Sequence, residues 1–144
     1  MTRRNLPDDE IAAFLARPLV ATLATYRKDG SVLLSPVWQE WRDGGFNIIV
    51  GRGDVKARSI ARDPRASVAV YESDPPYTGV ELRATARILD DDPHALTRRL
   101  AIRYMGAARG EDYARATAGD AQLWLRLEPG DLRSWDYKDL WPPD

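Results

Sequence analysis

Residues 46–71 read FNIIVGRGDVKARSIARDPRASVAVY, and this stretch indicates how the chain folds. FNIIV (46–50) is apolar and rich in β-branched residues, and RASVAVY (65–71) alternates larger and smaller side chains, so both segments are typical of strands. The segment between them predicts a helix over residues 55–62, which ends before Pro64 because the residue preceding a proline disfavours helical backbone. The stretch therefore predicts a strand, a turn, a short helix and a second strand.

The rest of the chain is also rich in predicted strands. Asp29-Gly30 predicts a hairpin turn, and Pro36 marks a strand edge or bulge, because proline cannot donate a ladder hydrogen bond. The other predicted strands are residues 18–25, 31–41, 80–89, 122–128 and 131–137. The other predicted helices are residues 7–16, 93–105 and 111–118. Hairpins with inserted helices, rather than a regular βαβ alternation, predict a mainly β fold: a small antiparallel barrel in a single domain over residues 1–144.

Composition excludes several classes of protein. The 144 residues include 21 Lys and Arg against 22 Asp and Glu, giving a formal net charge of −1, which argues against a nucleic-acid or membrane-surface protein. There are no cysteines, so disulfides, thiolate chemistry and cysteine-bound metals are excluded. The first residues lack the apolar core of a signal peptide, and no apolar run approaches about 18 residues. We expect a soluble, cytoplasmic protein.

Lys56 stands at an unusual place for a cation. If Asp54 is the N-cap, Lys56 is the second helical residue, where the helix dipole disfavours a positive charge by about 0.3–1 kcal/mol. A bound anion would reverse that cost, because it would meet free backbone N–H groups, Lys56 and Arg52 from the strand exit. Gly51 and Gly53 would permit close approach of the backbone. The pattern indicates a phosphate site.

The alternative is a solvated helix surface. Arg52, Lys56, Arg58 and Arg62 would then simply face water, with Asp54 and Asp63 near enough to pair with some of them. The stretch is neither a Walker loop nor a dinucleotide-binding motif, because the required spacing, third glycine and surrounding βαβ unit are missing. The local pattern leaves both interpretations open.

The order of segments resembles a known family, the split-barrel flavin and deazaflavin oxidoreductases, also called pyridoxamine 5′-phosphate oxidase-like proteins. The resemblance extends from about Ile11 to Tyr137. It is carried by FLARPLVATLAT (14–25), KDGSVLLSPVW (28–38), the opening stretch (46–71), VELRATARIL (80–89) and LRSWDY (132–137). It implies an antiparallel split β-barrel of six to seven strands, a homodimer, and a cofactor bound in a groove between the subunits.

The resemblance also implies a set of cofactor-binding residues. Lys56 and Arg52 would hold the cofactor phosphate, and Trp135 of the partner subunit would approach the site. The tricyclic ring would be bordered by Ser35, Pro36, Val37, Trp38, Ile49, Val50 and Gly51. Trp135 could equally be a core or interface aromatic.

Three functions remain open. The compact chain with SPVW and GRGDVKAR resembles the branch that uses the 5-deazaflavin coenzyme F420, whose acidic tail could meet Arg98, Arg99 or Arg103. The second is an FMN-dependent oxidoreductase of the same fold. The third is a non-catalytic flavin or haem carrier, although His94, the one histidine, suits helix capping better than haem ligation.

For an enzyme, we expect few catalytic side chains, because a reduced deazaflavin delivers hydride itself. Tyr26, Tyr77 and Tyr104 could supply a proton, but nothing local selects among them, so no catalytic residue is assigned. The substrate is expected to be a small planar conjugated molecule that stacks on the ring. No cluster of histidines or carboxylates indicates a metal site.

Overall fold

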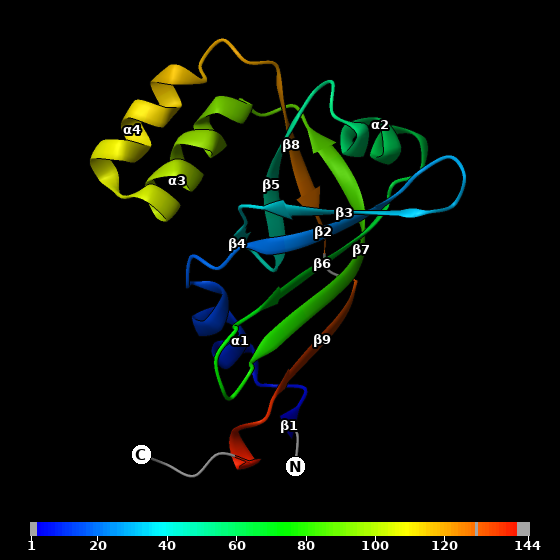
Figure 1. Ribbon diagram of the computed structural model, residues 1–144, viewed down its shortest axis with the longest axis vertical. Helices are drawn as coiled ribbons and strands as arrows, with labels where there is room; N and C mark the ends of the chain where they lie inside the picture. The colour runs from blue at the N-terminus through cyan, green and yellow to red at the C-terminus, as the bar shows by residue number, and fades with distance from the viewer. Residues whose placement is uncertain (1–2, 129, 141–144) are drawn as a thin grey trace.

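The computed structural model describes residues 3–128 and 130–140, whose strands form one antiparallel sheet (Figure 1). The strands are Arg3–Arg4 (β1), Ala21–Tyr26 (β2), Val32–Val37 (β3), Glu40–Arg42 (β4), Gly45–Gly51 (β5), Arg65–Tyr71 (β6), Gly79–Leu89 (β7), Gln122–Leu127 (β8) and Asp131–Asp136 (β9). The helices are Asp8–Leu15 (α1), Val55–Arg62 (α2), Pro93–Met105 (α3) and Ala107–Ala116 (α4), followed by a short 3-10 turn at Lys138–Leu140.

The sheet curls around the long strand β7. The main order is β3-β2-β6-β7-β8-β5-β4, while β9 also pairs with β7 and carries β1. β8 and β9 follow each other along β7, with Leu127 opposite Ala86 and Asp131 opposite Arg83. Gly130 lies at the corner between them, where an added Cβ would stand 2.1 Å from the carbonyl oxygen of Arg83. β7 thus belongs to both halves of a split barrel, and the corner requires glycine.

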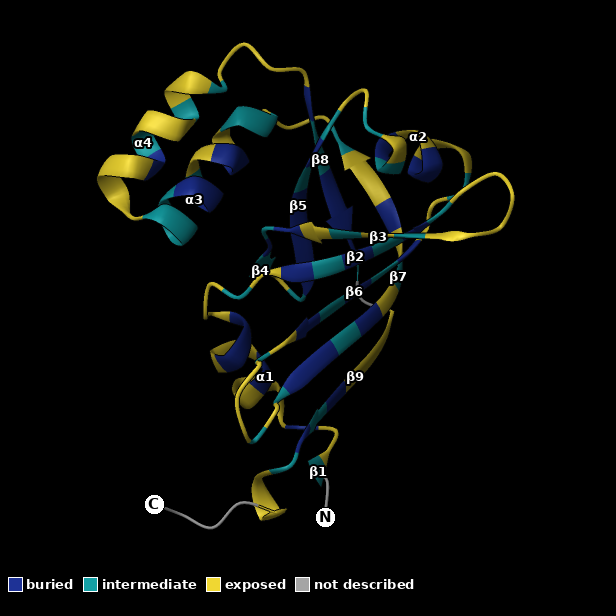
Figure 2. Cartoon of the chain, viewed as in Figure 1, coloured by how far each residue is buried: buried dark blue, intermediate teal, exposed yellow. Residues whose placement is uncertain are grey.

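The core lies inside the curl. Every second residue of the central strands points inward, as in β6, where Ala66, Val68 and Val70 are buried. Figure 2 shows buried positions concentrated along β5, β8 and the first half of β7. α1 packs its buried Phe14 and Leu15 against this core. The alternation of strand residues therefore decides which face is buried.

The sequence predicted the mainly β class and the helices correctly, but it missed the two-residue strand β1, and two further details differ. The predicted strand 31–41 is two strands, because the chain leaves β3 after Val37 and returns in β4. Pro36 lies in β3, an edge strand, where its missing N–H removes no ladder bond that the sheet needs. The second helix of the α-hairpin begins at Ala107 rather than Glu111, directly after Gly106, which has a positive φ of 86°.

The helices are short. α3, with 13 residues, is the longest in the described ranges, and none of the described helices is long and apolar enough to cross a bilayer.

Candidate functional site

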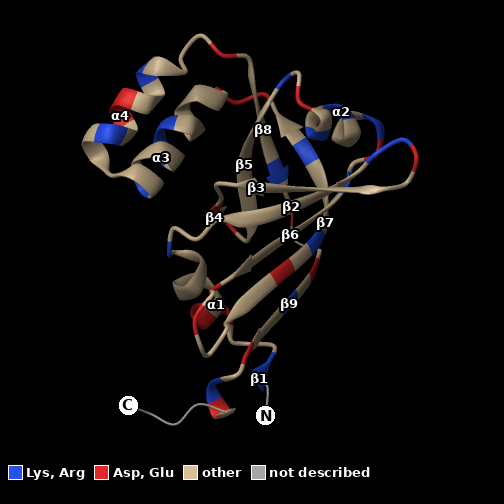
Figure 3. Ribbon diagram, viewed as in Figure 1, with Lys and Arg blue, Asp and Glu red and all other residues tan. Residues whose placement is uncertain are grey.

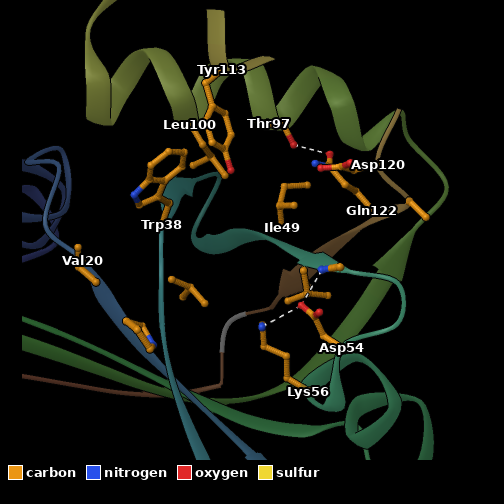
Figure 4. Close-up of a pocket in the computed structure, with 15 residues that line it drawn as sticks. Val20, Trp38, Ile49, Asp54, Lys56, Thr97, Leu100, Tyr113, Asp120 and Gln122 are labelled. Carbon is orange, nitrogen blue, oxygen red and sulfur yellow. Dashed lines mark hydrogen bonds and ion pairs between the residues drawn. The ribbon is translucent and has the colours of Figure 1, made fainter. Parts of the chain in front are cut away.

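A cleft of about 480 Å³ lies between the ends of β3 and β5, the start of α2 and the α3–α4 hairpin (Figure 4). This volume is in the range of small-molecule sites. Its lining consists of Val20, Pro36, Val37, Trp38, Ile49, Val50, Gly51, Asp54, Lys56, Thr97, Leu100, Tyr113, Asp120, Ala121 and Gln122.

Most of the residues predicted to bind a cofactor meet in this cleft. β3 and the residue after it form one wall, and the end of β5 forms the other. Lys56 reaches the same space from the first turn of α2. The predicted residues that border the cleft are Pro36, Val37, Trp38, Ile49, Val50, Gly51 and Lys56. Apolar walls and one cation therefore share a single hollow.

Three predicted residues do not border it. Ser35 lies opposite the buried Leu23, on the core face of β3, and is not part of the lining. Arg52 is exposed in the turn after β5, where its backbone N–H donates to the Ala121 carbonyl at 3.0 Å. Trp135 is half-buried in β9, and Figure 1 shows β9 at the end of the molecule away from α3 and α4.

Trp135 has a defined packing role within the chain. Its ring covers Gly79, its partner across the strands, where an added Cβ would lie 2.2 Å from the indole. The guanidinium of Arg133 lies 4.8 Å from the ring centroid. The tryptophan thus protects a glycine in β7, and its approach to another subunit stays a prediction.

The start of α2 differs from the expected cap. Asp54 is the residue before the helix, but its carboxylate makes no capping hydrogen bond. Its Oδ2 instead accepts from the backbone N–H of Gly51 and from Lys56 Nζ, each at 2.9 Å. The hydrogen bond from Lys56 helps to hold the pKa of the Asp54 carboxyl below its usual value. Gly51 allows this contact, because a Cβ there would stand 2.8 Å from Asp54 Oδ1.

Two other cations of the opening stretch bind backbone oxygens. Arg58 donates to the Gly53 carbonyl at 2.6 Å, and Arg62 donates to the Tyr26 carbonyl at 2.7 Å. These two arginines therefore stabilise the ends of β2 and the turn before α2. Figure 3 shows the cations distributed over the whole molecule rather than gathered at one face.

The three arginines considered for an acidic tail also have protein partners. Arg98 pairs with Glu111, and Arg99 forms two hydrogen bonds with Glu40, at 2.8 and 2.9 Å. Arg103 donates to the carbonyl oxygens of Leu15, Ala16 and Arg17 at the C-terminal end of α1. These three arginines therefore attach α3 to α4, to β4 and to the end of α1, and their side chains are engaged by the protein itself.

An aromatic cluster holds Trp38 at the cleft. Its ring stacks on Tyr104, with centroids 5.2 Å apart and planes 8° apart, and Tyr113 lies tilted at 5.3 Å. The Tyr104 hydroxyl donates to the Leu19 carbonyl at 2.8 Å and accepts from the Gln39 N–H at 3.0 Å. Trp38 is therefore positioned by α3 and α4 as well as by its own strand.

None of the three tyrosines suggested as proton sources borders the cleft. The Tyr104 hydroxyl is engaged with backbone, and Tyr26 lies under the guanidinium of Arg65, 4.6 Å from its ring centroid. Among the described residues, Tyr113 is the tyrosine that lines the cleft, and Figure 4 shows its side chain directed into it.

The sequence interpretation missed the helical side of the cleft. Thr97 and Leu100 come from α3, Tyr113 from α4 and Gln122 from the start of β8. The Thr97 hydroxyl donates to Gln122 Oε1 at 2.6 Å in a buried contact, which fixes the amide and leaves its NH₂ group as a donor. No local pattern marks these residues, because their meeting depends on how α3 folds back over the sheet.

The described residues contain no group of three His, Asp or Glu side chains that could hold a metal ion. The His94 backbone N–H is capped by Asp92 at 3.0 Å, and His94 Nε2 lies 3.0 Å from the Asp120 carbonyl oxygen. The histidine thus ties the start of α3 to the segment before β8.

Comparison with known proteins agrees with the split-barrel fold. The sequence profile of the pyridoxamine 5′-phosphate oxidase family matches residues 7–136, so the chain belongs to this family. A conserved hypothetical protein of Mycobacterium tuberculosis has a TM-score of 0.80 and 27% identity over 97% of this chain and 91% of its own. No curated protein matches the chain.

Two further solved structures share the fold. A structure described as an F420 reductase has a TM-score of 0.67 and 25% identity, covering 83% of this chain and 93% of its own. A FAD-binding protein of Mesorhizobium loti has a TM-score of 0.67 and 20% identity, covering 94% of this chain and 96% of its own. At 20% identity, the similarity to the FAD-binding protein shows a shared fold alone.

Proposed function

We propose that the protein is an oxidoreductase that uses coenzyme F420 to transfer hydride to or from a small planar conjugated molecule. The observation that carries this proposal is the shared cleft, in which apolar walls from β3 and β5 end at Lys56. Family membership supports a flavin-related function, and the similarity to an F420 reductase favours the deazaflavin.

The residues present fit such a cofactor. Trp38 and Ile49 would border a flat ring and keep water from it, and Lys56 would hold the phosphate. Arg52, exposed in the turn outside the lining, would add to this contact only by turning its side chain toward the cleft. The Gln122 amide, oriented by Thr97, would donate to a carbonyl oxygen of the ring. When bound, the reduced deazaflavin supplies the hydride. Tyr113 lines the same cleft, where its hydroxyl would be available to a bound acceptor.

We also propose a homodimer, with Trp135 of the partner subunit near the cleft. β3 is an edge strand whose Val32, Leu34 and Pro36 are exposed. Leu34 is 64% exposed, and Pro36 of the same strand borders the cleft. A second copy that covers this strand would bury apolar surface and close the open side of the site.

Titration of the purified protein with F420 and with FMN, followed by cofactor fluorescence, tests the choice of cofactor. We expect saturable binding that is tighter for F420. Binding of FMN alone would support the FMN-dependent alternative instead. A bound, reduced cofactor that never passes hydride to any conjugated acceptor would support the carrier alternative.

Lys56→Ala tests the phosphate contact. We expect F420 affinity to fall by about tenfold or more, because a charge-assisted hydrogen bond is lost. The thermal midpoint should change little, since the ion-pair partner of Lys56 within residues 3–128 and 130–140 is the partly exposed Asp54. Lys28→Ala, in the exposed turn between β2 and β3, is the matched control. Equal affinities of the two variants would mean that the turn is a solvated surface.

A further inference from the structure

Asp54 occupies the donors that a cofactor phosphate would use. Its Oδ2 accepts from Gly51 N and from Lys56 Nζ, each at 2.9 Å, so one carboxylate oxygen joins the end of β5 to the first turn of α2. The Asp54 side chain is 42% exposed and that of Lys56 is 22% exposed. Figure 4 shows both side chains at the same end of the cleft, with the carboxylate between the lysine and β5.

The cleft lining carries no excess of positive charge. Its charged side chains are one cation, Lys56, and two anions, Asp54 and Asp120. Arg58 and Arg62 donate to backbone carbonyl oxygens, and Arg52 lies outside the lining. An anion that binds near Lys56 must therefore share the lysine with Asp54 or displace the carboxylate.

We propose that Asp54 is a specificity-determining residue that favours a cofactor with a singly charged phosphate diester over one with a doubly charged phosphate monoester. This inference rests on the proposed function, because it assumes that a phosphate binds beside Lys56. F420 carries its phosphate as a diester and FMN as a monoester.

The discrimination follows from charge. A monoester has a second pKa of about 6, so it carries close to two negative charges at neutral pH, whereas a diester carries one. Asp54 repels both, but its repulsion of the monoester is about twice as large at the same distance. Lys56 supplies one positive charge, and Asp54 already supplies one negative charge. A diester therefore leaves one negative charge unpaired at this end of the cleft, whereas a monoester leaves two.

The geometry also allows the residue to be changed without loss of the turn. An asparagine at position 54 keeps an oxygen that can accept from the Gly51 N–H, and it removes only the charge. Serine is a second neutral replacement that suits the residue before a helix. Both variants leave Lys56 in place.

The experiment measures the affinities of F420 and FMN for the wild type, Asp54→Asn, Asp54→Ser and Asp120→Asn by fluorescence titration at neutral pH and low salt. We expect the two Asp54 variants to bind FMN about five- to tenfold more tightly, with a gain of at most about threefold for F420. Asp120→Asn, which removes the other carboxylate of the cleft, should change the FMN-to-F420 affinity ratio less than twofold.

The outcomes separate the two proposals. Binding of neither cofactor to the wild type would overturn the proposed function itself. Binding of both, with an FMN-to-F420 ratio that is unchanged in the Asp54 variants, would overturn only the role of Asp54. Equal shifts of that ratio in Asp54→Asn and Asp120→Asn would also overturn it, because they would indicate a general effect of net charge. Circular dichroism melts identify any variant that fails to fold, and the remaining Asp54 variant then decides.

Discussion

At the scale of the residue, the hydroxyl of Tyr104 connects packing to the site. It satisfies the backbone of Leu19 and Gln39 on either side of the β2–β3 hairpin, while its ring supports Trp38. A buried backbone group that loses its partner costs more than the hydrogen bond itself contributes. A single side chain on α3 thus fixes the wall of the cleft.

Tyr104→Phe should therefore destabilise the protein by about 1–3 kcal/mol, because it keeps the stack on Trp38 but leaves the Leu19 carbonyl and the Gln39 N–H without the hydroxyl. Urea unfolding measures the change. Tyr113→Phe is the control, since the Tyr113 ring is partly exposed, and we expect a change within about 0.5 kcal/mol. Equal stability of the two variants would show that the Tyr104 hydroxyl is dispensable.

At the scale of the element, Glu40 and Arg99 attach α3 to the sheet. Glu40 in β4 accepts two hydrogen bonds from Arg99 and one from Asn47 Nδ2, at 3.0 Å. Burial alone would raise the pKa of Glu40, but the hydrogen bonds from Arg99 and Asn47 hold it below the ordinary value of 4.5. The same contact raises the pKa of Arg99. The helix that supplies Thr97 and Leu100 to the cleft thus depends on an ionised carboxylate.

A carboxyl group whose pKa is lower in the folded than in the unfolded protein stabilises the folded state at pH values above its unfolded pKa. The unfolded chain binds the proton first, so this stabilisation is fully present above about pH 4.5 and is lost as pH falls through the lower folded pKa. Glu40→Gln should reduce stability at pH 7 by about 1–3 kcal/mol and should flatten the fall in stability between about pH 5 and pH 3.

Urea unfolding across this pH range measures the effect. Asp112→Asn is the control, because Asp112 pairs with Arg115 on the exposed surface, where ion pairs contribute little. If the free energy of unfolding of Glu40→Gln depends on pH as that of the wild type does, Glu40 does not contribute to the pH dependence.

For the molecule as a whole, the main surface without a covering element is the open edge of the sheet at β3. β3 and β4 are the two end strands of the main order. β2 pairs with one edge of β3, and the other edge of β3 is open within the described residues. β3 also carries exposed apolar side chains. Proteins protect such edges with charge, bulges or a covering element. We infer that a second copy of the chain covers this one.

Leu34→Arg should therefore convert the protein to a monomer, because it places a charge in the centre of the proposed interface. Light scattering should give twice the 16.2 kDa chain mass for the wild type and the chain mass for the variant. F420 affinity should fall in parallel if the partner completes the cleft. Ile88→Arg, at another exposed apolar position, is the control. A monomeric wild type would exclude the homodimer, and a dimeric Leu34→Arg variant would exclude this interface.

Patterns along the chain were enough to predict most of the elements and the two strand ends that form the cleft. The alternation in the strands and the Asp-Pro helix start at Asp92 predicted the elements, because these signals come from residues near one another in the chain. The family resemblance added the split barrel, Lys56 and both apolar walls. Which side chains complete the site depends on contacts between distant parts of the chain. Thr97, Tyr113 and Gln122 reach the cleft because the α3–α4 hairpin folds back over the sheet. Likewise, the turn bends the Asp54 carboxylate away from capping and onto Gly51 and Lys56, a choice between two hydrogen-bond partners that no local pattern specifies.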